Sequence, residues 1–446
     1  MPPQGLDTLA AEIEAVKTAH WVGRVVDIGS GLLRVSGLSQ VAALGDLVEI
    51  FQSDGSRIGG EVLRLDGTLV TILPDGMLPG LQVGDPVKLI GESVISPLDS
   101  WIGRVIDPFG RPLGGPPLLR GAVARPLAGE PINPTERRPL GTRLETGMAV
   151  FNTLLPIVRG QRIGLFAGSG VGKSTLLGRL AIGLEADVVV VALIGERGRE
   201  LREFTDKILG PSGMKRAIVV AATSDQSALV RRRCAWTAMA VAEHFRDRGK
   251  HVLFLADSLT RFAEAHREIA LATGEPATLR GYPPSTAHLI TQLCERAGPG
   301  SGTSNDITAV FSVLVAGSDM EEPIADIVRG VLDGHFVLDR KIAERGRFPA
   351  IDLLRSVSRS LPDAASAEEN RLISRARALL GIYDRNELMI QAGLYSKGTD
   401  TNMDQAIAAW PKIEEFLAAS ERKGIAASFE RLANCLEAPQ EDPVDT

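Results

Sequence analysis

A glycine-rich turn between a strand-like run and a helix-like run constrains the fold of this chain more than any other feature. Residues 163–167 are apolar, residues 168–172 contain three glycines, and leucines at helical spacing follow. Four more apolar runs come later, with helical periodicity between them, at residues 188–194, 217–221, 252–256 and 307–315. Uninterrupted apolar strands that alternate with helices are typical of a parallel sheet covered on both faces. The pattern predicts a central α/β domain.

The turn also has the residues of a phosphate-binding loop. After Ala167 it reads Gly168-Ser169-Gly170-Val171-Gly172-Lys173-Ser174-Thr175. Glycines let backbone N–H groups point at phosphate oxygens, and the start of the next helix adds its positive dipole end. We expect Lys173 to reach the β and γ phosphates of ATP and the Ser174 hydroxyl to ligate Mg²⁺. The sequence therefore predicts ATP and Mg²⁺ as ligands of residues 168–175.

Two carboxylates follow predicted strands and belong at one edge of the sheet. Asp257 ends the run 252–256, where it could hold Mg²⁺ through the water shell of the metal. The alternative for Asp257 is a helix N-cap, a role that Ser258 could fill equally well. Glu196 follows the run 188–194, where it could polarise the water that attacks a γ phosphate. The alternative for Glu196 is a solvated cluster with the charged residues around it.

The regions on either side of the α/β pattern have different patterns of apolar residues. Residues 21–93 indicate a small barrel or sandwich, because short strand-like runs alternate with glycine turns, at 22–28, 32–35, 47–51, 61–65, 69–73 and 87–90. Residues 366–446 have helical periodicity and predict a C-terminal helical domain. Residues 1–20 have the spacing of an amphipathic helix, which either docks a partner or packs on its own chain. The remaining residues, 94–365, are assigned to the central domain.

Composition narrows the functional classes. The 446 residues exceed what one hydrophobic core usually supports. A net charge of -6 and an aromatic content of 4% argue against a nucleic-acid-binding body. The basic run 231–233 is therefore expected to be a solvated or interface face. Three widely spaced cysteines and the lack of an apolar run of membrane-spanning length favour a cytoplasmic protein, which would act at a membrane through partners.

Four segments together resemble one protein family: residues 168–174, 195–197, 257–261 and 349–359. They resemble the rotary ATP synthase α and β subunits and their relatives, and the last segment matches the family signature P-[SAP]-[LIV]-[DNH]-x-x-x-S-x-S. Within this family the chain is most similar to the flagellum-specific export ATPases, over about residues 22–436, and the segments 131–140 and 281–285 are further specific features. The resemblance implies an N-terminal β-barrel, a RecA-like central domain that binds ATP and a C-terminal helical domain.

The resemblance also implies roles that spacing alone cannot assign. Glu196 matches the water-activating glutamate of the family, and Arg197 matches its neighbour near the phosphates. Arg261 matches a second arginine of the nucleotide site, and Phe348 matches an aromatic residue that packs on adenine. Arg359 matches the arginine that reaches across a subunit boundary to the γ phosphate of the neighbour. Because Glu196 and Arg359 occur on one chain, identical subunits could complete each other's sites, and a homohexamer is implied.

By resemblance, Mg-ATP hydrolysis would energise flagellar type III protein export, with substrates unfolded or released at the cytoplasmic gate. The implied partners are a regulatory or stator protein at the N-terminal segment, a central stalk protein in the ring pore, export gate membrane proteins, and export substrates with their chaperones, but no nucleic acid. They would place the chain peripherally at the inner membrane.

Three alternatives stay open. One is a catalytic β-type subunit of a rotary ATP synthase, although the loop of that subunit ends in Lys-Thr, whereas this chain has Lys173-Ser174, and its acidic C-terminal stretch is absent here. The second is a hexameric nucleic-acid translocase. The third is service to a virulence secretion system in place of a flagellum.

Overall fold

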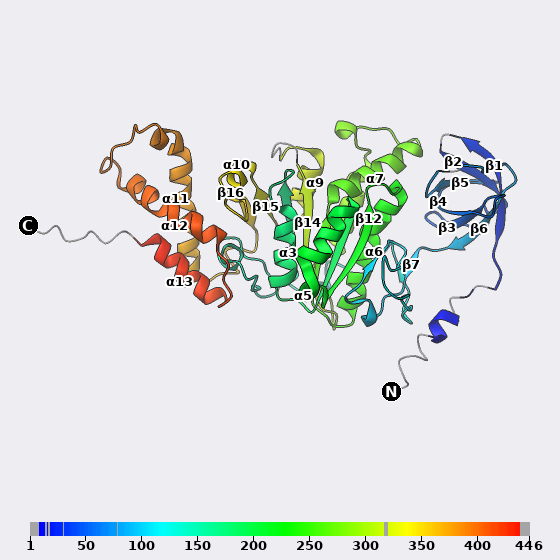
Figure 1. Cartoon of the computed structure of the whole chain (residues 1–446), viewed down its shortest axis with the longest axis horizontal. Helices are drawn as coiled ribbons and strands as arrows, with labels where there is room; N and C mark the ends of the chain where they lie inside the picture. The colour runs from blue at the N-terminus through cyan, green and yellow to red at the C-terminus, as the bar shows by residue number, and fades with distance from the viewer. Residues whose placement is uncertain are drawn as a thin grey trace, which may run out of the picture.

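The computed structural model describes residues 9–13, 16, 18–29, 31–77, 79–315 and 320–437. Its parts follow one another along the long axis of the molecule: a β-barrel, an α/β unit in the middle and a group of helices at the other end (Figure 1). The predicted fold class is confirmed. The domain limits given above stay predictions.

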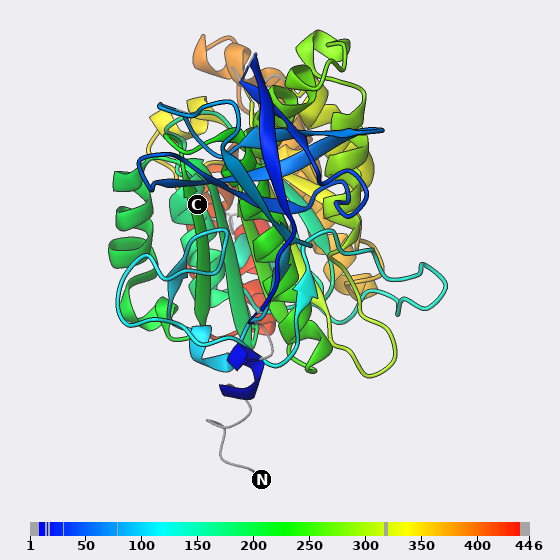
Figure 2. The ribbon, with the colours of Figure 1, turned by 90° about the vertical axis from the view of Figure 1, so that its right-hand side faces the viewer.

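The N-terminal barrel follows from strands whose residues alternate between inside and outside. In β3, for example, Val48 and Ile50 are buried and their neighbours are half-buried. The strands close in the order β1-β2-β5-β4-β3-β6, so a barrel forms and not a sandwich (Figure 2). They are β1 Val22–Gly29, β2 Leu32–Ser36, β3 Leu47–Phe51, β4 Arg57–Asp66, β5 Leu69–Pro74 and β6 Pro86–Gly91.

The central sheet has the order β16-β15-β10-β14-β13-β11-β12-β8 within the described residues. Neighbouring strands are parallel except for β15 and β16. The strands are β8 Val105–Ile106, β10 Arg162–Ala167, β11 Val188–Glu196, β12 Ala217–Thr223, β13 Val252–Asp257, β14 Ile307–Leu314, β15 Gly334–Leu338 and β16 Ile351–Ser358, and a small ribbon pairs β7 Val94–Ile95 with β9 Arg125–Pro126. The five predicted apolar strands all lie in this sheet. The sequence analysis did not predict β8, β15 and β16.

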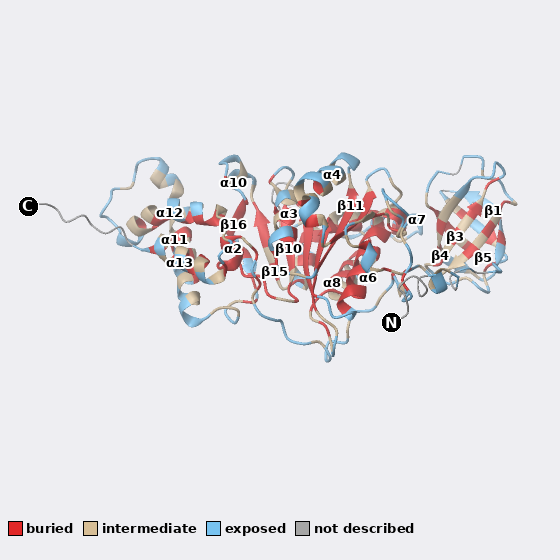
Figure 3. Cartoon of the chain, turned by 60° about the horizontal axis from the view of Figure 1, so that its bottom comes forward, coloured by how far each residue is buried: buried red, intermediate tan, exposed pale blue. Residues whose placement is uncertain are grey.

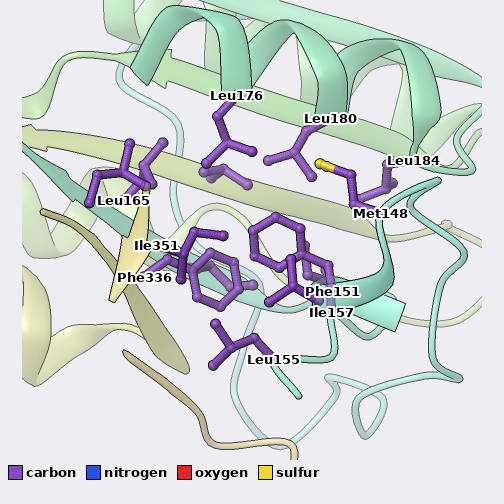
Figure 4. Packing of buried hydrophobic residues seen from close by; sticks show 14 of the residues in the cluster. Met148, Phe151, Leu155, Ile157, Leu165, Leu176, Leu180, Leu184, Phe336 and Ile351 are labelled. Carbon is purple, nitrogen blue, oxygen red and sulfur yellow. The ribbon is translucent and has the colours of Figure 1, made fainter. Parts of the chain in front are cut away.

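Helices cover both faces of the sheet, and the strands between them are buried (Figure 3). The first face packs on α6 Ala228–Asp247, α7 Leu259–Ala272, α8 Ser285–Glu295 and α9 Pro323–Val331. The second face packs on α2 Ala149–Asn152, α3 Lys173–Gly183, α4 Gly198–Glu203 and α5 Gly210–Met214. In this second core Leu176 and Leu180 of α3 lie over Phe151 and Phe336, whose ring centroids are 4.7 Å apart (Figure 4). Short helical segments complete the unit: η1 Asp99–Trp101, η2 Phe204–Leu209, η3 Leu279–Gly281 and α10 Arg340–Glu344.

The C-terminal helices share a core with the central unit. They are α11 Ala367–Gln391, α12 Thr401–Ala418 and α13 Ile425–Leu436. A capping box of Ser366 and Glu369 begins α11. The Glu369 carboxylate also accepts two hydrogen bonds from Arg143, at 2.8 and 2.9 Å, which fixes the start of α11 to the segment before α2.

The basic run at the start of α6 is engaged within the chain. Arg231 pairs with Glu268 at 2.7 Å, and Arg232 pairs with Glu61 of the barrel at 2.5 Å. Arg233 donates to the Pro108 carbonyl at 3.0 Å. These contacts join α6 to the barrel, to the connecting segment and to α7.

Much of the predicted N-terminal amphipathic helix lies outside the described residues. Residues 9–13 are helical, and the side chains of Leu9 and Ile13 are exposed. Along the described ranges no helix is long and apolar enough to cross a membrane.

Candidate functional site

The glycine-rich turn joins β10 to α3 at the carboxyl edge of the sheet. Gly170 and Gly172 have φ values of 77° and 89°, which residues with a side chain rarely adopt. Helix α3 begins at Lys173. Ser169 and Thr175 are exposed and Ser174 is half-buried. Backbone N–H groups at the start of a helix of eleven residues therefore lie open to an anion, as the sequence predicts.

Lys173 meets both predicted carboxylates. Its Nζ contacts Oδ1 of Asp257 and lies 3.7 Å from Oε1 of Glu196. The two carboxylates end β13 and β11, which are neighbours in the sheet and parallel, so their side chains emerge at the same edge. Ser258, and not Asp257, caps α7 through its side chain. Glu196 is half-buried and lies beside both Lys173 and its charged neighbour Glu200.

The environment of Glu196 favours its protonated form. Burial and, second to it, the nearby Asp257 carboxylate raise the pKa of Glu196 to about 7, although the Lys173 ammonium opposes both effects. A carboxyl group with a pKa near neutrality is suited to exchange a proton with water. Glu196 is connected to the glycine-rich turn by its contact with Lys173.

Two predicted arginines flank these carboxylates. Arg261 lies in the first turn of α7, packs against Gly195 and pairs with Glu264 at 2.8 Å, which raises the pKa of its guanidinium. Arg197 precedes α4, and its largely exposed side chain lies 3.5 Å from Glu200. Both are at the edge of the site, where their side chains remain accessible to a ligand.

Phe348, which the resemblance places on the adenine, lies against the glycine-rich turn. A Cβ atom built on Gly172 would be 3.2 Å from the Phe348 ring, and this residue is half-exposed. Arg347 holds the segment on either side of Phe348 in place. Its guanidinium donates to the Pro349 and Ile351 carbonyls, at 3.2 and 2.8 Å, and to Glu414 of α12 at 2.9 Å.

Arg359 is not brought to this site. It follows β16, which is antiparallel to β15, so it lies at the opposite edge of the sheet from the glycine-rich turn. Its side chain donates to the carbonyls of Leu332 and Arg329, at 3.1 and 3.2 Å. The six residues of β10 separate the two edges by roughly 20 Å at about 3.3 Å per residue. Arg359 therefore does not contact the Lys173 of its own chain.

Sequence reasoning missed two residues of the site. One is Arg347, and the other is Ser312, whose hydroxyl donates to Oδ1 of Asp257 at 2.8 Å. A usable signal for Ser312 was present, because it is a hydroxyl residue inside the apolar run 307–315. A buried hydroxyl on a strand needs a hydrogen-bond partner.

Comparisons with known proteins agree with this geometry. Residues 147–358 match the ATP synthase alpha/beta family nucleotide-binding domain, and residues 365–434 match the type III secretion EscN ATPase C-terminal domain. The chain is 44% identical to the flagellum-specific ATP synthase of Caulobacter vibrioides, over 92% of this chain and 94% of that protein. It is 41% identical to the type 3 secretion system ATPase of Xanthomonas euvesicatoria, over 92% of each.

Solved structures give the same result. The assembled ATPase EscN of the enteropathogenic E. coli type III secretion system aligns with a TM-score of 0.84 at 37% identity, covering 93% of this chain and all of that one. EscN in complex with its central stalk EscO aligns with a TM-score of 0.83, at the same identity and coverage. The chain therefore belongs to the ATP synthase alpha/beta family of P-loop ATPases, in the branch of the flagellum-specific ATP synthases and type III secretion ATPases.

Proposed function

We propose that this chain hydrolyses Mg-ATP to energise protein export through a flagellar type III apparatus, where it unfolds or releases export substrates at the cytoplasmic gate. The observation that carries the proposal is the meeting of Lys173, Asp257 and Glu196 beside the glycine-rich turn. These residues come from three separate elements, and the names of the relatives point to flagellar and type III export.

The residues present fit a magnesium ion. Carboxylate and hydroxyl oxygens are the donors that this ion prefers, and Asp257 and the half-buried Ser174 offer them. These two residues would hold Mg²⁺, which would neutralise phosphate charge during hydrolysis. The backbone of residues 168–175 would hold the phosphates and Phe348 would pack on the adenine.

The protein groups then divide the work on the γ phosphate. Lys173 exchanges its carboxylate partners for phosphate oxygens and neutralises their charge. Glu196 orients the attacking water and takes up its proton, for which its raised pKa suits it. Arg197 and Arg261, at the rim, approach the phosphates as the site closes. Arg359, at the far edge of the sheet, serves the site of a neighbouring subunit.

A ring of identical subunits follows from the position of Arg359. Only a second copy can bring that guanidinium to a γ phosphate if the fold stays as it is, and a closed homohexamer gives every subunit the same two neighbours. Assembly and a central stalk, described for EscN, support a ring with a stalk protein in its pore. A regulatory protein at the N-terminal segment, the membrane gate, and substrates with their chaperones complete the proposed partners. The chain would act in the cytoplasm, peripherally at the inner membrane.

Glu196→Gln tests this function. Because glutamine keeps the shape of the side chain but cannot accept a proton, affinity for ATP should stay within a few fold while turnover falls by about two to four orders of magnitude. Glu203→Gln, which changes an exposed glutamate at the end of α4, is the matched control and should retain turnover. Binding by equilibrium dialysis and phosphate release measure the two quantities. Equal losses in both for Glu196→Gln would mark a structural residue instead. In cells, the same variant should abolish motility and flagellin secretion, and loss of other type III substrates alone would point to a virulence system.

A further inference from the structure

Ser312 lies between the two halves of the proposed site. Its strand, β14, pairs with β10 on one side and with β13 on the other, so it separates the strand that carries the glycine-rich turn from the strand that ends in Asp257. Ser312 is paired in register with Leu165 and is fully buried. It is a hydroxyl residue in an otherwise apolar part of the strand, and its hydroxyl group hydrogen-bonds the Asp257 carboxylate.

Both contacts of the Asp257 carboxylate go to one oxygen. Ser312 Oγ donates to Oδ1 at 2.8 Å, and Lys173 Nζ contacts the same atom. Among the described residues, neither of these two contacts engages Oδ2. The Asp257 side chain is 3% exposed, so its rotation is decided by these few polar contacts.

The two contacts differ in what happens when a nucleotide binds. Lys173 belongs to the glycine-rich turn and, under the proposed function, moves to the phosphates. Ser312 belongs to the middle of the sheet and stays. A second contact fixes its strand to the segment after Asp257, since the Leu314 N–H donates to Thr260 Oγ1 at 2.8 Å. The hydroxyl of Ser312 thus remains the group that sets the direction of Oδ2 in the loaded site.

We propose that Ser312 is a positioning residue for the divalent cation, because its hydroxyl holds Oδ1 of Asp257 and thereby aims Oδ2 at the water shell of Mg²⁺. The inference rests on the proposed function. Hydrogen-bonded partners of groups that hold a metal typically contribute about 10–100-fold to metal affinity or activity. Loss of the hydroxyl should therefore weaken cation binding without weakening the phosphate cradle.

The test measures cation binding directly on the full chain. Mn²⁺ serves as the probe, because its free form is counted by electron paramagnetic resonance, and a non-hydrolysable ATP analogue supplies the phosphates. Ser312→Ala should raise the apparent Kd of Mn²⁺ by about tenfold or more, with binding of the analogue in EDTA unchanged. Ser312→Thr, which restores a hydroxyl, should recover most of the affinity.

Thr308→Ala is the matched control. Thr308 lies four residues earlier on the same strand, is equally buried and hydrogen-bonds His251 at 2.8 Å, far from the turn. The Thr308→Ala protein should lose about as much stability as the Ser312→Ala protein. Its Kd for Mn²⁺ should equal that of the wild type. If Ser312→Ala does not fold, Ser312→Cys replaces it, with the same direction expected because a thiol is a weak donor.

The outcomes separate the two proposals. Unchanged Mn²⁺ binding in a folded Ser312 variant, or an equal loss in Thr308→Ala, overturns the positioning role while the proposed ATPase stands. Failure of the wild type to bind Mn²⁺ with the analogue overturns the proposed function and this inference with it.

Discussion

Two largely buried charged residues, Lys173 and Arg347, have partners that hold each side chain in one position. Lys173 faces two carboxylates, and Arg347 is bonded to a carboxylate and two carbonyls. Such groups are costly to bury alone, and their pairing therefore fixes side-chain direction as well as charge. Asp75, just after β5, is a buried carboxylate whose neighbours do not fully compensate for its burial. Burial raises the pKa of Asp75 to about 6, and the nearby Arg233 opposes this effect without cancelling it.

Asp75→Asn should therefore stabilise the protein above neutral pH. The folded-state pKa of about 6 exceeds the ordinary 3.8, so the folded chain binds the extra proton and loses stability as pH rises from about 4 to above 6. The variant should gain about 1–3 kcal/mol over the wild type at pH 7.5 and nothing at pH 4. Urea unfolding of both proteins at the two pH values measures the difference. A gain that is the same at both would contradict a titrating Asp75.

At the scale of elements, an ion pair joins the C-terminal helices to the residue beside Phe348. Arg347 precedes Phe348 and pairs with Glu414 of α12, so the ring that faces the turn is attached to the helical end of the molecule. The side chain of Arg347 is 8% exposed, which makes removal of its partner costly. The position of α12 and that of the Phe348 ring are thus linked.

Glu414→Gln should weaken ATP binding by about three- to tenfold, equivalent to roughly 1 kcal/mol, because the Phe348 ring loses its support. Inorganic tripolyphosphate lacks the adenine and should bind as before. Glu415→Gln, the next residue and an exposed partner of Arg431, is the control and should bind both ligands normally. Calorimetric titration measures each affinity. Equal weakening for ATP and tripolyphosphate would show that the pair acts on the phosphates instead.

Elements differ in how far the sequence predicts them. The strands at 163–167 and 252–256 are predictable because strands buried on both faces are apolar throughout. Strand β16 was missed because it is an antiparallel edge strand with exposed and polar positions, and its residues read as a motif. The contacts of Ser312 and Arg347 join residues 55 and 67 positions apart, and spacing along the chain does not reveal such pairs.

For the whole molecule, one separation matters most. The glycine-rich turn and Arg359 lie at opposite edges of the same sheet, so under the proposed function one chain would hold two halves of different sites. The barrel, the sheet and the C-terminal helices lie along one axis (Figure 1). An arginine supplied by a neighbour contributes about 10³ to 10⁵ in rate in phosphoryl-transfer enzymes.

Mixing two inactive variants in one ring tests this claim most directly. Lys173→Ala lacks the phosphate-binding lysine and Arg359→Ala lacks the transferred arginine, so each alone should be inactive, and Arg359→Ala should still bind ATP. In rings mixed at random from equal amounts, about one quarter of the interfaces pair an intact turn with an intact arginine, and ATP hydrolysis should recover to about that fraction of the wild type. No recovery, in rings shown to contain both variants, would contradict a site shared between subunits.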